Sequence, residues 1–127
     1  MPVQHNTKEE WPWPEELDAM IVSANHHTIL LENEYVRVLN VHIPAGETTA
    51  VHTHKWPAVN HILSMADYIR YDGQGNVIAD TRNNTTPLKT PVTVWSESLP
   101  PHALQNVGER PIHIISIEVK SAGVIGK

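Results

Sequence analysis

Residues 44–54 read Pro-Ala-Gly-Glu-Thr-Thr-Ala-Val-His-Thr-His, and this stretch decides the fold and the site that the sequence predicts. The Pro-Ala-Gly segment is a turn signal, and the run that follows it is typical of a β-strand. Because side chains alternate between the two faces of a strand, we expect His52 and His54 to project from the same face, about two residues' rise apart. In that position they can bind one metal ion together. The plainer alternative for such a pair is two solvent-facing histidines near the end of a strand.

Short runs rich in Val, Ile, Leu and Thr recur on both sides of this stretch, with turn signals between them. This rhythm is typical of an antiparallel sandwich or barrel, and no helix of ordinary length fits after residue 28. The sequence therefore predicts an all-β domain over residues 28–127, preceded by an N-terminal arm over residues 1–27 that packs on it. The predicted strands are Thr28–Leu31, Tyr35–Ile43, Thr48–His54, Val59–Leu63, Tyr68–Tyr71, Val77–Ala79, Val92–Trp95, His102–Asn106 and Ile112–Lys120.

The run Tyr35–Ile43 carries branched apolar residues on both of its faces. Such a strand is expected to be covered on both sides, as in a small closed barrel or at a dimer interface. Together with the tryptophans of the arm, this apolar surface predicts a homodimer. The residues expected to share one face of the run are Arg37, Leu39, Val41 and Ile43.

A third histidine, His102, follows a Pro-Pro pair and precedes Asn106 by four residues. With these residues the chain resembles the cupin superfamily, whose first motif reads G-x5-H-x-H-x3–4-E-x6-G and whose second motif reads G-x5-P-x-G-x2-H-x3-N. Gly46, His52 and His54 stand at the first three fixed positions of the first motif. His102 and Asn106 stand at the last two fixed positions of the second motif.

The resemblance implies an RmlC-like jelly-roll barrel, also called a double-stranded β-helix, with a divalent metal ion at its mouth and with His52, His54 and His102 as ligands. More narrowly, the chain is similar to the small single-domain bacterial cupins that have no assigned reaction. Three protein ligands leave open positions on the ion, as in a catalytic site. Histidine ligands suit Fe, Zn, Ni or Cu, and they suit calcium or magnesium poorly.

The chain departs from both motifs. Where the first motif has its glutamate, this sequence has Val59, or Ala58 at the tighter spacing. Three neutral imidazoles would leave the full charge on a divalent ion, so we expect the ligand to be a small anionic molecule. The glycine, proline and glycine of the second motif are replaced by Pro91, Glu97 and Leu99.

Several side chains near the predicted ligands are candidates for the rest of the site. His61 is the candidate catalytic residue, as a base, a substrate contact or, if a bulge shifts the register, a fourth ligand; a core histidine is the alternative. Trp56 and Trp95 are candidate substrate-binding walls, or else core residues. Asn60 or Glu97 could complete the metal shell instead, although a solvated loop glutamate is the simpler interpretation of Glu97.

The remaining histidines have no partner at a metal-binding spacing. His113 alternates with isoleucine and valine on one face of the last run, so we expect it to be a core histidine. The histidines to which we assign no function are His5, His26, His27 and His42.

The composition excludes several classes of protein. The 127 residues suit one domain, and the absence of cysteine excludes disulfides, thiol catalysis and zinc–thiolate sites. The net charge is −5 and basic residues never cluster, which argues against nucleic acid as a partner. The sequence has no export signal and no run approaching the ~18 apolar residues of a membrane span, so we expect a cytoplasmic protein without a membrane partner.

Two functions fit these residues. The first is a metal-dependent enzyme, with dioxygenase-like or Lewis-acid chemistry on a small anionic organic molecule. The second is a non-catalytic cupin that binds a small molecule or a metal, as a sensor or a storage protein. The missing glutamate and the altered second motif favour the second function slightly. A carbonic-anhydrase-type zinc site and a purely structural role fit less well.

Overall fold

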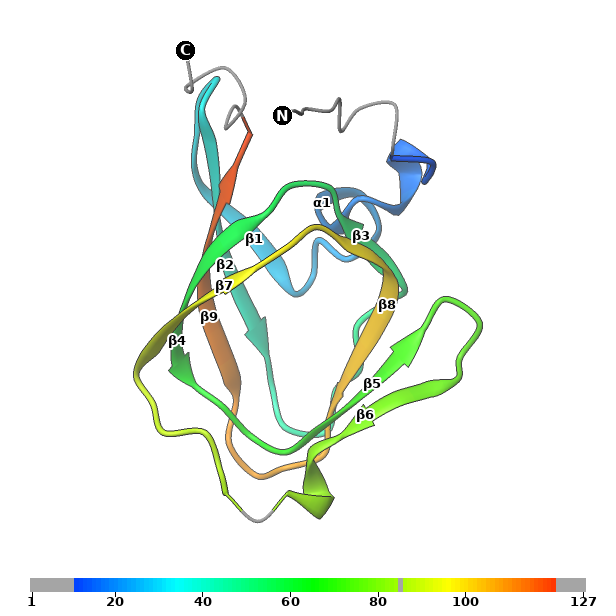
Figure 1. The fold of residues 1–127 in the computed structure, drawn as a ribbon, viewed down its shortest axis with the longest axis vertical. Helices are drawn as coiled ribbons and strands as arrows, with labels where there is room; N and C mark the ends of the chain where they lie inside the picture. The colour runs from blue at the N-terminus through cyan, green and yellow to red at the C-terminus, as the bar shows by residue number, and fades with distance from the viewer. Residues whose placement is uncertain (1–10, 85, 121–127) are drawn as a thin grey trace, which may run out of the picture.

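The computed structural model describes residues 11–84 and 86–120, so the predicted arm is described only from residue 11 onward, and His5 lies outside the described residues. Two sheets face each other, and the chain passes repeatedly from one to the other (Figure 1). The five-stranded sheet consists, in spatial order, of β1 (His27–Glu32), β2 (Val36–Ile43), β9 (Ile112–Val119), β4 (Ala58–Ser64) and β7 (Val92–Ser96). The four-stranded sheet consists of β3 (His52–His54), β8 (Leu99–Asn106), β5 (Tyr68–Asp72) and β6 (Val77–Asp80).

Every pair of neighbouring strands in both sheets is antiparallel. The prediction of an all-β, antiparallel sandwich or barrel is therefore confirmed. In the part of the chain that the structure describes, helical structure is confined to short pieces, namely α1 (Ala19–Val22) and two 3₁₀ turns at Glu15–Leu17 and Thr81–Asn83. Within the described ranges, no helix is long and apolar enough to cross a membrane.

β2 shows how the sequence pattern positions the core. Leu39, Val41 and Ile43 are buried, and they pack with Ile112 of β9 as the hydrophobic core cluster. Arg37 is buried on the same face, as the alternation of side chains predicts. The opposite face of β2 is half-buried and becomes exposed at His42, so the chain itself covers that face only in part.

The segment before the barrel is fastened to β2 by an aspartate. The Asp18 carboxylate caps α1 by accepting a hydrogen bond from the backbone N–H of Met20, at 3.0 Å. It also accepts two hydrogen bonds from the guanidinium of Arg37, at 3.0 and 3.1 Å. β1 follows directly and begins at His27, so the last residue of the predicted arm belongs to the five-stranded sheet.

The two motif residues outside the histidines shape the turns around the site. Gly46 has a φ of 87°, a left-handed conformation that a residue without Cβ adopts at little cost, and it ends the turn before β3. Asn106 is fully buried, and its amide nitrogen donates to the carbonyl oxygens of Ile43 and Arg110, at 2.9 and 2.8 Å. Its amide oxygen accepts from the backbone N–H of Gly108. Asn106 therefore holds the ends of β2, β8 and β9 together.

Candidate metal centre and ligand cavity

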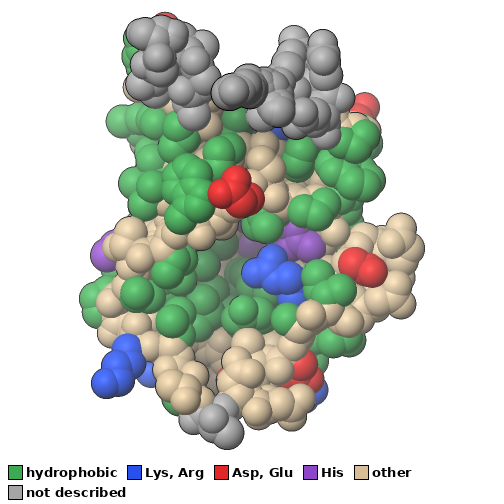
Figure 2. Space-filling view, in the orientation of Figure 1, with side chains coloured by type: hydrophobic (Ala, Val, Ile, Leu, Met, Phe, Trp, Pro, Cys, Tyr) green, Lys and Arg blue, Asp and Glu red, His purple; other side chains and the backbone are tan. Residues whose placement is uncertain are grey.

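A cavity of about 1100 Å³ lies between the two sheets. Figure 2 shows it as a hollow in one face of the molecule, with histidine side chains at its inner wall. Much of the wall is apolar, with side chains such as Val41, Ile62 and Leu104. Four histidines also line it, and we call them the cavity histidines: His27, His52, His54 and His102.

β3 and β8 bring together the three histidines that the sequence predicts as ligands. His52 is the cross-strand partner of His102, and their ring centroids are 4.4 Å apart. The ring centroid of His54 lies 5.0 Å from that of His52 and 5.8 Å from that of His102. Both histidines of β3 therefore reach the cavity, as their spacing predicts.

His27 joins this group from β1 and changes the set of candidate ligands. Its ring centroid lies 4.9 Å from that of His52 and 5.3 Å from that of His54. One ring nitrogen from each of these three residues lies within 4.8 Å of the others, close enough for them to share one metal ion. We assigned His27 no function from the sequence, and the structure corrects this. No spacing along the chain relates it to β3, and only its pairing with Val41 of β2 places it on the inner face of the sheet.

Each cavity histidine has its Nδ1 atom bonded to an oxygen acceptor. Because a carbonyl oxygen only accepts, three of the Nδ1 atoms must carry the proton, which leaves Nε2 of these rings with a lone pair. Metal-binding histidines typically hold their second nitrogen in this way, since the bond fixes both the tautomer and the orientation of the ring. The acceptors are the carbonyl oxygens of Ser23 for His27 (2.9 Å), Ala50 for His52 (2.7 Å) and Pro100 for His102 (2.8 Å), and the carboxylate of Glu118 for His54 (2.9 Å).

Burial keeps three of these rings neutral at physiological pH. Burial and the neighbouring imidazoles lower the pKa of His52 to about 2 and that of His27 to about 4. Burial likewise lowers the pKa of His102 to about 3, and the positive charge of Arg70 adds to this shift. A metal ligand must be the neutral imidazole, so His27, His52 and His102 are in the protonation state that metal binding requires.

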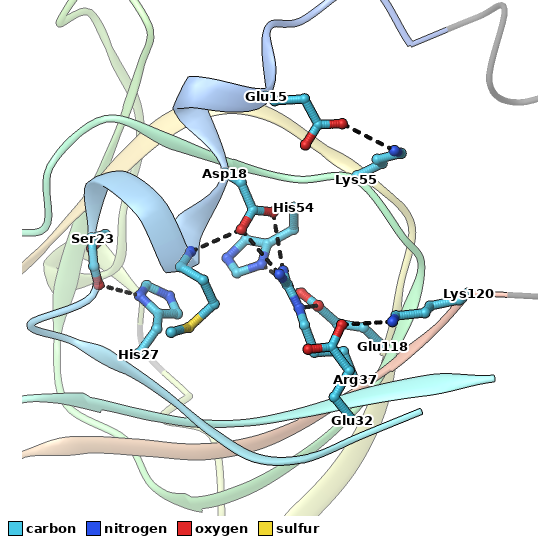
Figure 3. Close-up of polar contacts among 11 residues, drawn as sticks. Glu15, Asp18, Ser23, His27, Glu32, Arg37, His54, Lys55, Glu118 and Lys120 are labelled. Carbon is cyan, nitrogen blue, oxygen red and sulfur yellow. Dashed lines mark hydrogen bonds and ion pairs between the residues drawn. The ribbon is translucent and has the colours of Figure 1, made fainter. Parts of the chain in front are cut away.

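Glu118 of β9 supplies a carboxylate next to the cavity histidines (Figure 3). It is fully buried, and one of its oxygens accepts from Nε of Arg37 at 2.6 Å while the other bonds to Nδ1 of His54 at 2.9 Å. In the sheet it lies directly opposite Ala58 of β4. At the tighter spacing, Ala58 is the position at which the first motif has its glutamate. The carboxylate thus comes from the neighbouring strand, where it orients a histidine.

The register of β4 decides which of its residues reach the cavity. Ala58, Asn60 and Ile62 line the cavity, so the residues between them face the outside of the sheet. His61 is one of these, and its Nδ1 lies 2.9 Å from the hydroxyl of Thr93 on β7. The structure therefore does not bring His61 to the cavity histidines.

Asn60 lies in the cavity wall, but both ends of its amide are engaged there. Its nitrogen donates to the hydroxyl of Ser96 at 2.9 Å, and its oxygen accepts from the hydroxyl of Ser116. These partners lie on β7 and β9, on either side of β4. Asn60 is thus held as a polar part of the wall by its two neighbouring strands.

The two candidate substrate-binding tryptophans lie in different places. Trp56 lines the cavity, and the guanidinium of Arg37 lies 5.0 Å from its ring centroid. Trp95 is 54% exposed on β7, and its indole N–H donates to the carboxylate of Glu97 at 2.6 Å. The structure thus places neither Trp95 nor the exposed Glu97 among the residues that line the cavity.

Comparisons with known proteins agree with this architecture. No family model and no curated protein matches the chain. Among solved structures, it is similar to a cupin domain from Bordetella pertussis Tohama I (TM-score 0.60, 21% identity, covering 75% of this chain and 92% of that chain). It is also similar to an RmlC-like cupin family protein with a double-stranded β-helix fold from Methanocaldococcus jannaschii (TM-score 0.54, 12% identity, covering 80% and 84%). An uncharacterized conserved protein with a double-stranded β-helix domain from Klebsiella pneumoniae matches with a TM-score of 0.50 and 18% identity, covering 96% and 93%.

These likenesses are all below 25% identity, and they show the fold. The chain is a double-stranded β-helix of the cupin type, as the resemblance of its motifs implies. Within this fold, His27, His52 and His54 form a possible metal site.

Proposed function

We propose that the chain is a metal-binding cupin, in which the cavity histidines hold a divalent transition-metal ion and the cavity binds a small anionic organic molecule. The observation that supports this most is the set of four converging imidazoles, each with Nδ1 committed to an oxygen acceptor. Fe, Zn, Ni or Cu would suit such a donor set. When bound, the ion would supply Lewis-acid chemistry or, if it is iron, dioxygen chemistry.

The residues of the site have separate tasks in this proposal. His27, His52 and His54 form the central ligand set, because their nitrogens lie closest together. His102 is the fourth ligand, since its ring lies 4.4 Å from that of His52. Glu118 orients the ring of His54 through Nδ1.

The charge around the site supports an anionic ligand. Carboxylates are absent from the ligand set, and the charge of Glu118 is paired with the guanidinium of Arg37 at 2.6 Å. Neutral imidazoles leave the charge of a divalent ion unreduced, so an anionic oxygen would be attracted to it. The cavity of about 1100 Å³ leaves room for an organic molecule beside the ion.

Metal analysis of the purified protein and of single variants tests the site. We expect close to one transition-metal ion per chain, and a strong loss in His52→Ala. His27→Ala tests the central member that β1 contributes, and His102→Ala tests whether the fourth histidine also binds the ion. His42→Ala is the matched control, because this histidine is exposed on the opposite face of β2. Metal content well below one per chain that His52→Ala leaves unchanged would rule the site out.

An enzyme and a binding protein would use the same residues, so turnover separates them. We propose the enzyme first, because a ligand in this cavity would lie directly against the ion. Oxygen uptake and product formation with small carboxylates, diketones and thiols would be measured on the metal-loaded protein. Tight ligand binding without any turnover across this panel would establish the non-catalytic function instead.

A further inference from the structure

We propose that Arg70 of β5 binds the anionic group of the ligand, and that this ligand is a carboxylate with an apolar body. The inference rests on the proposed function, since it names the ligand class of the same cavity. It stands on three observations: where Arg70 lies, what its guanidinium lacks, and what the rest of the cavity wall is made of.

Strand register places Arg70 beside the cavity histidines. In the four-stranded sheet, Arg70 lies opposite Leu104 of β8, and Asp72 lies opposite His102. Residues two apart on one strand share a face, so Arg70 and His102 are diagonal neighbours on the same side of the sheet, about 7–8 Å apart at the backbone. Both line the cavity. Figure 2 shows a basic side chain next to the histidines in the hollow.

The guanidinium of Arg70 is half-buried and has no acceptor among the residues that the structure describes. Its contact is a cation–π contact with the ring of Tyr68, whose centroid lies 5.9 Å away. The contrast with Arg37 is plain, because that guanidinium makes three hydrogen bonds to two carboxylates. A guanidinium has five N–H donors in a planar fork that matches a carboxylate with two parallel hydrogen bonds. Arg70 thus has its donors available for a ligand.

The side chain of Arg70 shares the cavity with the proposed metal ligand His102, from the neighbouring strand of the same sheet. A carboxylate between Arg70 and His102 would therefore meet positive charge on one side and the proposed ion on the other. This arrangement favours an anion at this point of the cavity over a neutral group of the same shape.

The rest of the wall indicates the remainder of the ligand. Apolar side chains from both sheets line the same cavity as Arg70, among them Ile62, Leu104 and Ile114. These would contact a hydrocarbon or aromatic body rather than a second charged group. An inorganic anion would satisfy the guanidinium but would leave this apolar surface in contact with water. We therefore infer a carboxylate with an apolar body rather than phosphate.

Calorimetric titration with small probes tests this assignment. The probes are hexanoate and benzoate, their neutral amides hexanamide and benzamide, and inorganic phosphate, each added to the metal-loaded and to the chelator-treated protein. We expect both carboxylates to bind at least about tenfold more tightly than their amides, a difference that one charge-assisted contact can supply. In Arg70→Gln this preference should disappear, and in Arg70→Lys it should return in part, because lysine keeps the charge but not the fork.

Arg82→Gln is the matched control. It removes the same charge from a guanidinium that is paired with Asp80 and does not line the cavity, so carboxylate binding should stay as in the unmodified protein. Metal content and circular dichroism are recorded for every variant. Unchanged metal content with no loss of carboxylate preference in Arg70→Gln would overturn the role of Arg70 while leaving the metal site intact. Phosphate binding more tightly than either carboxylate, or no carboxylate binding up to the solubility limit, would overturn the ligand class.

Discussion

The inner face of the five-stranded sheet holds buried charge, whereas its outer face holds a continuous apolar row. On the inner face, Arg37 of β2 pairs with Glu118 of β9, and both are buried. On the outer face, the strand registers align five apolar residues, one from each strand. This outer row consists of Leu31, Val38, Ile117, Val59 and Trp95.

A simple core would hold only apolar side chains on the inner face, whereas here a buried ion pair lies beside the apolar core residues of β2 and β9. A buried ion pair adds little stability compared with apolar packing, so the charges on the inner face are better explained by the site that they support. The apolar row adds no contact across the barrel, and Leu31 and Trp95 at its two ends are 52% and 54% exposed. We therefore assign the proposed ligand chemistry to the inner face and the contact of the expected homodimer to the outer face.

Removing the carboxylate of Glu118 should have the largest effect, both on the unfolding free energy and on metal affinity. In Glu118→Ala, the buried guanidinium of Arg37 keeps Asp18 as its one hydrogen-bonding partner among the described residues, and the ring of His54 loses its acceptor. We expect a loss of about 3–5 kcal/mol in unfolding free energy and a fall of about 10–100-fold in metal affinity. Chemical denaturation and metal titration measure the two effects. Glu118→Gln keeps the shape of the side chain and so separates the effect on stability from the effect on metal affinity. Unchanged metal affinity in both variants would show that Glu118 does not orient His54 for metal binding.

Local sequence pattern was enough to predict one half of this site. Alternation along a strand placed His52 and His54 on one face, and the cupin resemblance added His102, which the structure pairs directly with His52. The same alternation predicted which residues of β2 share a face, whereas the strand was expected to be covered on both sides and is fully buried on one. These features depend on residues a few positions apart or on a motif, so they can be predicted from a single sequence.

The other half depends on pairing between distant strands. Glu118 reaches His54 only because β9 lies between β2 and β4, and His27 reaches the site only because β1 pairs with β2. No local pattern encodes such long-range neighbours. His61 shows a further difficulty: the two motif spacings differ by one residue, and a shift of one residue exchanges the faces of β4. Of the two positions that the motif spacings allow, the structure places Ala58, and not Val59, in the cavity wall.

The second-largest effect is expected from lowering the pH, which should decrease the unfolding free energy because it protonates histidines of the unfolded chain that stay neutral on the inner face. In the unfolded chain, histidine titrates near pH 6.5, whereas burial lowers the pKa of His27 to about 4, of His52 to about 2 and of His102 to about 3. Between those values and 6.5 the unfolded state binds more protons, so the unfolding free energy falls as the pH drops below 6.5. Each histidine contributes at most about 1.4 kcal/mol per pH unit.

Denaturation of the metal-free protein between pH 7.5 and about pH 4.5 measures this slope. His52→Gln removes one of the titrating groups, so its slope should be shallower than that of the unmodified chain. A stability that does not change over this range would show that the cavity histidines are solvated in solution, against their burial in the structure.

Charging the outer row should change assembly without changing the inner face. In Leu31→Asp and Trp95→Asp, a charge replaces an exposed apolar side chain at either end of the row. We expect the homodimer to dissociate to a monomer, while metal content stays that of the unmodified protein. Size-exclusion chromatography with light scattering measures the mass. Thr28→Asp, at an exposed outward position in another row of β1, is the control. An unmodified protein that elutes as a monomer would contradict the homodimer.

The smallest effect is expected for His61→Ala, and it tests the division between the faces most directly. His61 lies on the same strand as Asn60, yet its recorded partner is Thr93 on the outer side of the sheet. Its removal deletes one partly exposed hydrogen bond, so the unfolding free energy should change by no more than about 1 kcal/mol. Metal content, carboxylate affinity and any turnover should match the unmodified protein, because the side chain does not line the cavity. If turnover disappears while metal content persists, His61 acts on the ligand as the sequence predicts, and the register of β4 in solution differs from the one described.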